Sequence, residues 1–302
     1  MTVHNARTVD TASVSFPGAG TWAGGSGRGG YPMMPGYMMM PGPAGGSSSP
    51  GQAVQGTAAN AANASATTSE NWAGYASAGG AGTFTSVSAS WAEPSVTCGA
   101  PTTFSSFWVG LDGDGTASVE QTGTDADCNG GVAAYQGWFE MFPNAPVFYD
   151  NPVEPGDAMS ASVVADGGGA FTLTLTDSTR GWTQTTDQTS DTAELGSAEV
   201  IAEAPSSETG TVLPLSDFGT VSFTGVTVDQ TAIGNENPSA LTMVSASDVT
   251  EATPSALTGG SAFTVTWDGN GTGTVPTPTG TATAPGTSGR PGRHHHHHGF
   301  GG

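Results

Sequence analysis

Apolar and polar residues alternate along the middle of the chain, so that every second residue is hydrophobic. In TSVSASWAEP this alternation places Val87, Ala89 and Trp91 on one face of an extended segment. The later segments FTLTLTD, TVSFTGVTV and SAFTVTW repeat the pattern. A period of two is typical of strands with one buried face, and helical periodicity is nearly absent. The pattern predicts an all-β protein.

Turn-forming residues separate these segments, as in EPG at 154–156, DGGG at 166–169 and GNEN at 234–237. So many short strands in about 200 residues exceed what one open sheet accommodates before it curls or splits. We therefore expect two packed antiparallel sheets, a concanavalin-like β-sandwich of the jelly-roll type.

Composition separates this sandwich from two flanking segments. Residues 1–69 are rich in Gly, Pro, Met and Ala without a period, and they contain too few apolar side chains to offset the entropy of ordering the chain. Residues 269–302 form a Thr/Pro/Gly tail that we expect to be disordered, and its His tract is either a tag or a natural feature. The folded domain is therefore predicted at residues 70–268. No apolar stretch in the sequence is long enough to span a membrane.

The charge of the chain is strongly negative, with a formal net charge of −21 and no Lys. All 26 Asp and Glu residues except Asp10 lie between Glu70 and Asp268, where Arg180 is the only basic residue. Nucleic-acid and anionic-membrane partners need clustered Lys and Arg, so this charge argues against both. At about pH 3 the domain would carry little net charge, which suits a protein that works in acid. Adaptation to solubility or to salt is the alternative explanation.

The two cysteines, Cys98 and Cys128, both lie in the domain, in a region without His. Such a lone pair indicates a disulfide rather than a metal site, and it favours an oxidising compartment. A disulfide between them would close a loop of about 30 residues and contribute roughly 3 to 4 kcal/mol in the chain-entropy model. Residues 1–30 show no basic segment followed by an apolar one, so export is inferred without a recognisable signal peptide.

All six histidines lie outside the domain, at His4 and His294 to His298. This excludes Ser-His-Asp and Cys-His nucleophile pairs and imidazole metal ligation within the domain. With Lys absent as well, proton transfers in an enzyme of this composition fall to carboxyl groups. Asp112 and Asp114 could form a turn or a calcium loop, but the downstream Glu of an EF-hand is missing. We expect no metal and no cofactor.

Strand parity narrows the candidate carboxyl groups. If YQGWFEMFP is a strand, one face carries Gln136, Trp138, Glu140 and Phe142, a polar and aromatic mixture suited to a cleft. In SAEVIAEAP, Glu199, Ile201 and Glu203 share one face, opposite Ala198, Val200 and Ala202. Gln121 shares its face with Val119, and Glu120 lies opposite. A glycosidase with two carboxyl groups stays open, because the sequence does not give their separation.

Six blocks in this order resemble the glutamic peptidases, the eqolisin family. They are NWAGY at 71–75, FWVGLDGDG at 107–115, VEQTGTD at 119–125, WFEMFP at 138–143, SAEVIAEAPSS at 197–207 and LPLSDFGTVSFTG at 213–225. The resemblance implies a secreted, acid-active endopeptidase with a catalytic dyad of Gln121 and Glu199. It implies supporting or substrate-binding roles for Asp112, Asp125, Trp138, Glu140 and Phe142. It also implies that residues 1–69 are a propeptide, removed near Ser69.

Three positions depart from the family pattern: Val200 replaces the usual Trp, Phe142 a common Tyr, and Gln136 an Asp. We expect these departures to change subsite preference more than the dyad. Protein or peptide substrates and a monomeric state are expected. Two alternatives remain: a glycosidase that uses Glu140 and Glu199, and a non-catalytic β-sandwich that binds carbohydrate through Trp138 and neighbouring aromatic residues.

Overall fold

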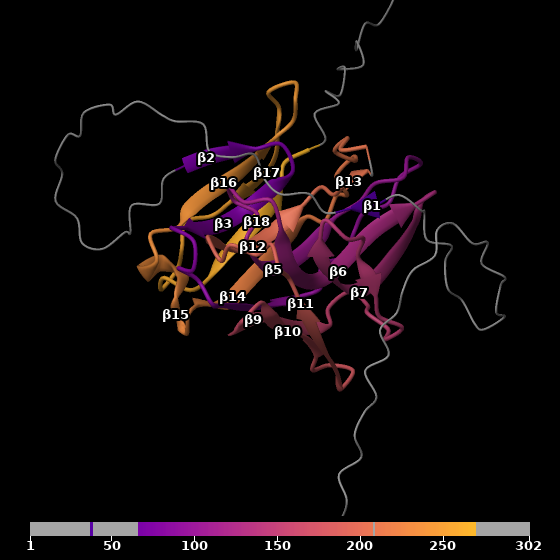
Figure 1. Ribbon diagram of the computed structural model, residues 1–302. Coiled ribbons are helices and arrows are strands. Elements are labelled where there is room, and N and C mark those ends of the chain that lie inside the picture. The colour runs from indigo at the N-terminus through magenta and orange to yellow at the C-terminus, as the bar shows by residue number, and fades with distance from the viewer. Residues whose placement is uncertain (1–36, 39–65, 208, 270–302) are drawn as a thin grey trace, which may run out of the picture. The chain divides into compact units, whose positions relative to one another are not determined.

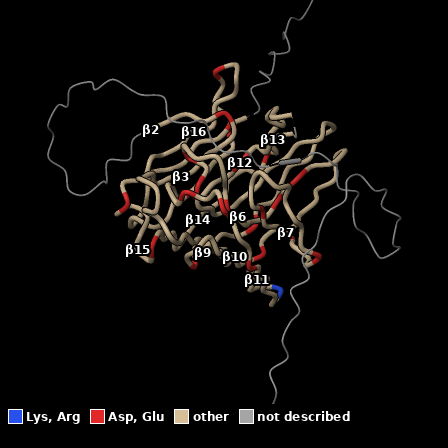
Figure 2. The backbone as a smooth tube through the Cα atoms, viewed as in Figure 1, with Lys and Arg blue, Asp and Glu red and all other residues tan. Residues whose placement is uncertain are grey.

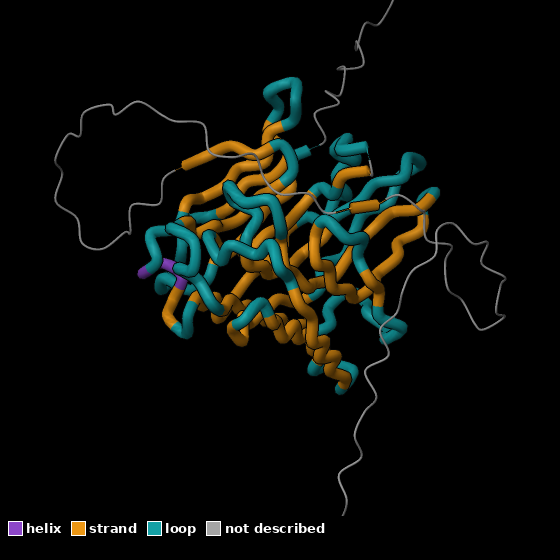
Figure 3. The backbone as a smooth tube through the Cα atoms, viewed as in Figure 1, coloured by secondary structure: helices purple, strands orange, loops and turns teal. Residues whose placement is uncertain are grey.

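The computed structural model describes residues 66–207 and 209–269, together with the backbone of Tyr37 and Met38. Most of the predicted propeptide, nearly all of the predicted tail and every His lie outside these residues. In the described part, all regular structure is β-strand except one 3₁₀ turn, η1 (Ile233–Asn235) (Figure 3). The prediction of an all-β protein is confirmed. None of the described segments is a helix long and apolar enough to cross a membrane.

The strands form one continuous hydrogen-bonded path that folds over on itself (Figure 1). In order along this path the strands are β11 (Trp182–Thr189), β10 (Ala170–Asp177), β9 (Ala158–Gly167), β4 (Ser86–Ala92), β14 (Thr220–Val228), β18 (Phe263–Trp267), β17 (Thr250–Pro254), β16 (Ser239–Val244), β3 (Trp72–Ala78), β12 (Ser197–Glu203), β5 (Ser106–Leu111), β6 (Val119–Asn129), β7 (Val132–Phe142) and β8 (Val147–Phe148). Neighbouring strands on the path are antiparallel.

Four short strands lie off this path. Strand β15 (Thr231–Ala232) pairs with β14, and β2 (Ala66–Ser69) pairs in parallel with β16. Strand β1 (Tyr37–Met38) pairs with β13 (Ser206–Ser207) in a separate two-stranded ladder. The described part of the sheet therefore includes Ala66–Ser69, which precede the domain predicted at residues 70–268.

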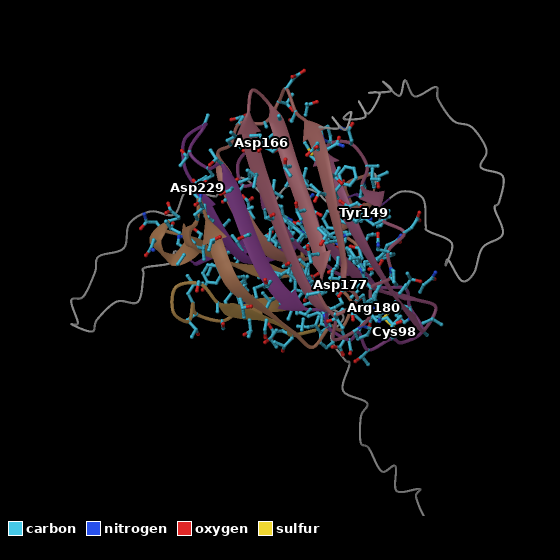
Figure 4. The ribbon with its side chains drawn as sticks, turned by 90° about the horizontal axis from the view of Figure 1, so that it is seen from below. Cys98, Tyr149, Asp166, Asp177, Arg180 and Asp229 are labelled. Carbon is cyan, nitrogen blue, oxygen red and sulfur yellow. A yellow bond between two sulfur atoms is a disulfide. The ribbon has the colours of Figure 1, made fainter. Side chains whose placement is uncertain are left out.

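The two halves of the path pack face to face. Strands β4, β9, β10 and β14 of one layer contact β5, β6, β7 and β12 of the other. Strands β17 and β18 connect the two layers along the hydrogen-bonded path. Figure 4 looks onto the first of these layers, where Asp166 and Asp177 mark opposite ends of the β9 and β10 strands. The expected β-sandwich is confirmed.

Period-two alternation produced the core as predicted. In β4 the side chains of Val87, Ala89 and Trp91 are buried between the layers, and the residues between them are half-buried. Strand β10 repeats this arrangement with Phe171, Leu173 and Leu175. Strand β12 differs, because all seven of its residues are buried. Both faces of β12 are therefore covered, and only one of them faces the opposite layer.

The predicted disulfide is present and joins Cys98, in the loop before β5, to Cys128 near the end of β6. Arg180 is the only basic residue of the described domain, and it lies in the turn between β10 and β11 (Figures 2 and 4). Its guanidinium forms ion pairs with Asp157 and with Glu154, and it lies close to Asp177. One cation therefore binds three of the many carboxyl groups.

Candidate active site

Strand register brings Gln121 and Glu199 onto one face of the sheet. Gln121 on β6 lies directly opposite Gly110 on β5, and Gly110 lies directly opposite Glu199 on β12. Residues directly opposite each other in neighbouring strands point to the same face. With strands about 4.8 Å apart, the two backbones are separated by about 10 Å. The two side chains therefore extend from this face on either side of a glycine.

Gly110 is required by the space around it rather than by its backbone angles. A Cβ atom at this position would lie 2.9 Å from Cζ3 of the Trp108 ring and 3.2 Å from Cβ of Gln121. Any other residue would therefore displace the Trp108 ring or the Gln121 side chain. A flat floor of backbone separates the two polar side chains.

Glu140 continues the same row on the far side of Gln121. It lies opposite Gln121 on β7, and Nε2 of Gln121 donates a hydrogen bond of 2.6 Å to Oε2 of Glu140. Both side chains are buried. Because a carboxylate oxygen accepts, this bond fixes which end of the Gln121 amide carries the nitrogen. Oε1 of Gln121 is then left buried, with no hydrogen-bond partner among the described residues.

Glu199 is fully buried, and neither of its carboxyl oxygens has a hydrogen-bond partner in the described part of the chain. Burial raises the pKa of Glu199 well above its ordinary value, and the negative charges of Asp114 and Asp112 raise it further. The hydroxyl of Ser197 and the backbone N–H of Asp114 lower the pKa of Glu199, but neither stands at hydrogen-bonding geometry. In this environment the neutral acid is the favoured form.

Asp112 lies in the turn after β5, where its carboxyl group binds backbone N–H groups. Its Oδ2 accepts hydrogen bonds from the backbone N–H groups of Glu194 and Leu195, and its Oδ1 accepts one from Gly196, each at 2.8 Å. Its own N–H donates to the carbonyl oxygen of Ser197. The Asp112 side chain thus holds the segment that leads into β12.

Asp125 shares the face of Gln121 but lies four residues further along β6, about 13 Å away at the usual rise per residue. It accepts a hydrogen bond of 2.6 Å from the Ser106 hydroxyl, and it lies opposite Gln136. Gln136 donates a hydrogen bond to the carbonyl oxygen of Tyr149. The structure therefore does not bring Asp125 next to the predicted dyad.

Aromatic side chains form the rest of this face. Trp138 is buried in a small apolar cluster with Trp72 and Trp108, separate from the core between the layers, and Phe142 packs against this cluster. The rings of Trp72 and Trp108 meet edge to face with centroids 5.0 Å apart. Trp138 and Trp108 lie on either side of Gly123 of β6, and Trp138 is two residues before Glu140 on β7. The aromatic face and the polar row therefore form one surface.

Val200, which replaces the family Trp, points the other way. It is fully buried in the core between the layers, next to Glu199 in sequence but on the opposite face of β12. Its effect on Glu199 is therefore limited to the packing beneath the strand.

The structure also places Gly110, Asp114, Ser197 and Glu120 at or beside this site. The sequence indicated a turn or a calcium loop for Asp114 and no role for the other three. Gly110 could be recognised only from strand register, because a lone glycine in a strand has no distinctive local signal. The other three depend on how the turns after β5 and before β12 approach each other. No group of three or more His, Cys, Asp or Glu side chains in residues 66–207 and 209–269 is arranged to hold a metal ion.

Comparison with known proteins identifies the family and the fold. The sequence model of the Peptidase A4 family matches residues 70–267. A crystal structure of scytalido-glutamic peptidase with a transition state analog inhibitor is similar, with a TM-score of 0.58 and 23% identity over 66% of this chain and 98% of that one. The structure of SCP-B, a member of the eqolisin family, in a complex with the tripeptide Ala-Ile-His gives a TM-score of 0.53 and 23% identity with the same coverage. No curated protein matches the chain.

At these identities the two structures establish the shared fold, and the family match extends over the whole described sandwich. The chain therefore belongs to the Peptidase A4 family, the eqolisin glutamic peptidases, and is a hydrolase that acts on peptide bonds.

Proposed function

We propose that the chain is an acid-active endopeptidase in which Gln121 and Glu199 activate a water molecule against a peptide bond. The row in which these two side chains flank Gly110 carries the proposal. Buried polar atoms are ordinarily hydrogen-bonded. Oε1 of Gln121 and both carboxyl oxygens of Glu199 have no such partner among the described residues, so they are available to water and a peptide group.

In this mechanism Glu199 acts first as a general base. It takes a proton from the water, whose oxygen bonds to the carbonyl carbon of the substrate and gives a tetrahedral intermediate. Glu199 then returns the proton to the leaving nitrogen as the carbon–nitrogen bond breaks. The products are a carboxylic acid and an amine, and the side chain is regenerated.

Gln121 orients the water and stabilises the intermediate. One N–H of its amide is held by Glu140, which leaves the second N–H to donate to the developing oxyanion and Oε1 to accept from the water. A well-placed donor of this kind lowers the barrier by about 3 to 4 kcal/mol. An amide suits this role in acid, because it donates without titrating.

The pKa of Glu199 connects the site to pH. Burial is the main cause of its raised pKa, so water entering the site lowers that pKa towards the ordinary value. The base role requires the ionised form and the acid role the neutral one. We therefore expect activity in acid, with an acid limb that follows the ionisation of Glu199 in the accessible site.

The remaining parts of the proposal concern the protein as a whole. The disulfide between Cys98 and Cys128 fits a secreted protein, and the acidic domain fits peptide substrates rather than nucleic acids or anionic membranes. We expect a zymogen whose propeptide lies within residues 1–69, a monomeric mature enzyme whose domain includes residues 70–268, and chemistry that needs no cofactor.

The glycosidase alternative is disfavoured. Glu140 and Glu199 lie three strand spacings apart, about 14 Å between backbones, with Gln121 on a strand between them. Glu140 is also bound to Gln121. Membership of a peptidase family decides against a purely carbohydrate-binding role.

The dyad is tested by incubating the processed protein with denatured globin at about pH 3 and about pH 7 and following the fragments by mass spectrometry. We expect cleavage in acid that Glu199→Gln abolishes and that Gln121→Ala reduces by a factor of about 100 to 1,000. Glu70→Gln, at an exposed position, serves as the matched control and should retain activity. Undiminished cleavage by a folded Glu199→Gln protein would refute the proposed dyad.

A further inference from the structure

Glu120 is a buried acid directly beside Gln121 that the proposed mechanism does not use. It lies opposite Leu111 on β5 and Met141 on β7, both of which belong to the core between the layers. Glu120 therefore points into that core, away from the face that carries Gln121. Its side chain is fully buried, and neither carboxyl oxygen has a hydrogen-bond partner among the described residues.

Besides burial, three groups from different parts of the chain influence the pKa of the Glu120 carboxyl. They are the hydroxyl of Ser118 before β6, the hydroxyl of Ser190 before β12, and the carboxyl of Asp112 after β5. Asp112 is the charged group that faces Glu120, because the opposing residue on β7 is the uncharged Met141. An acid without a partner thus lies against a second acid.

Asp112 is also the residue that holds the entry to β12. Its carboxyl group accepts the N–H groups of Glu194, Leu195 and Gly196, and its own N–H binds the carbonyl of Ser197, the first residue of β12. The Asp112 carboxyl is therefore hydrogen-bonded to the segment that leads, two residues after Ser197, to Glu199.

We propose that Glu120 is a positioning residue for peptide hydrolysis: as a neutral acid it leaves the Asp112 clamp intact, and as an anion it repels Asp112 and displaces Glu199 from Gln121. This inference rests on the proposed roles of Gln121 and Glu199. Glu120 touches neither the substrate nor the reacting atoms. It acts on the reaction only through Asp112 and the segment from Glu194 to Ser197.

The electrostatics of the pair set the direction of the effect. Burial, and after it the negative charge of Asp112, raises the pKa of Glu120 to about 8. Glu120 is therefore neutral in acid and loses its proton as the pH rises towards 8. The clamp is intact in acid and is disturbed on the alkaline side, where kcat should fall without a matching change in KM.

The test compares Glu120→Gln with Glu93→Gln. Glu93 is another buried acid whose pKa burial raises to about 8, but it binds Trp91 and Thr124 and is remote from the Asp112 clamp. Each variant is assayed for kcat and KM between about pH 3 and pH 8, below its unfolding temperature. The expected result is that Glu120→Gln moves the alkaline fall of kcat upward by about one pH unit or more, and that Glu93→Gln leaves it in place.

A second readout does not depend on activity. Hydrogen-exchange protection of the Glu194, Leu195 and Gly196 amides, corrected for intrinsic rates, should fall above about pH 7 in the wild type and persist in Glu120→Gln. Asp112→Asn should lower this protection at every pH. Equal shifts of the kcat profile in Glu120→Gln and Glu93→Gln, or amide protection unaffected by pH in the wild type, would overturn the proposal. Because exchange is measured without substrate, failure of the dyad assignment would leave this result interpretable.

Discussion

A side chain at position 110 would occupy the space across which the two proposed catalytic groups act. Gly110 has ordinary backbone angles, so its conformational freedom is not the reason for a glycine. The reason is the close approach of Trp108 and Gln121. At the scale of single residues, the site thus depends on the lack of a Cβ atom at position 110 as well as on the side chains of Gln121 and Glu199.

We expect Gly110→Ala to lower kcat by about 100-fold while the protein still folds, since a displacement of about 1 Å in a catalytic group is enough for such a loss. Gly80→Ala is the matched control, because Gly80 also has ordinary backbone angles and a Cβ there meets no atom within 4 Å. Steady-state kinetics with a peptide substrate and circular dichroism of both variants check this. Wild-type kcat in Gly110→Ala would show that the floor between Gln121 and Glu199 tolerates a methyl group.

At the scale of elements, the sequence predicted faces but not neighbours. Alternation predicted that Glu199 and Val200 lie on opposite faces of β12, and that Gln121 and Glu120 lie on opposite faces of β6. The structure has both arrangements. Alternation is local and has a fixed period, so it survives in the sequence. Register depends on contacts between segments far apart in the chain. For this reason the position of Gly110, the distance of Asp125 and the Asp112 clamp could not be predicted.

Strand β2 gives a prediction at the same scale. It pairs in parallel with β16, and the buried Ser69 hydroxyl accepts hydrogen bonds from the N–H groups of Asn71 and Trp72. Cleavage near Ser69, as the sequence suggested, would release β2 from β16. We therefore expect the mature enzyme to begin no later than Thr67, so that most of this pairing is kept. N-terminal sequencing of the active protein decides this, and a mature chain beginning at Glu70 or later would contradict it.

At the scale of the whole molecule, the unusual feature is where the acids lie. Glu93 joins the two layers, because the Thr124 hydroxyl on β6 and the Trp91 indole on β4 both donate to its Oε2. Burial is the first cause of the raised pKa values of Glu93, Glu120, Asp127 and Glu199. Asp157 shows the opposite shift: burial raises its pKa, but hydrogen bonding and the charge of Arg180 lower it by more. The composition predicts an acid-adapted protein, and the structure shows which carboxyl groups are buried.

These shifts predict a protein that becomes less stable as acid is neutralised. A buried acid with a raised pKa stabilises the fold fully below its unfolded pKa of about 4.3, and this contribution is lost as the pH rises through the folded value of about 8. Asp157 acts in reverse, and its contribution is lost only below about pH 4. We expect the free energy of unfolding to fall between about pH 4.5 and pH 8, by a few kcal/mol for a group such as Glu93. Denaturant unfolding at intervals across this range measures the fall, and Glu93→Gln should flatten it. A wild-type protein whose unfolding free energy rises from pH 4.5 to pH 8 would mean that ionised carboxyl groups, rather than neutral ones, hold the two layers together.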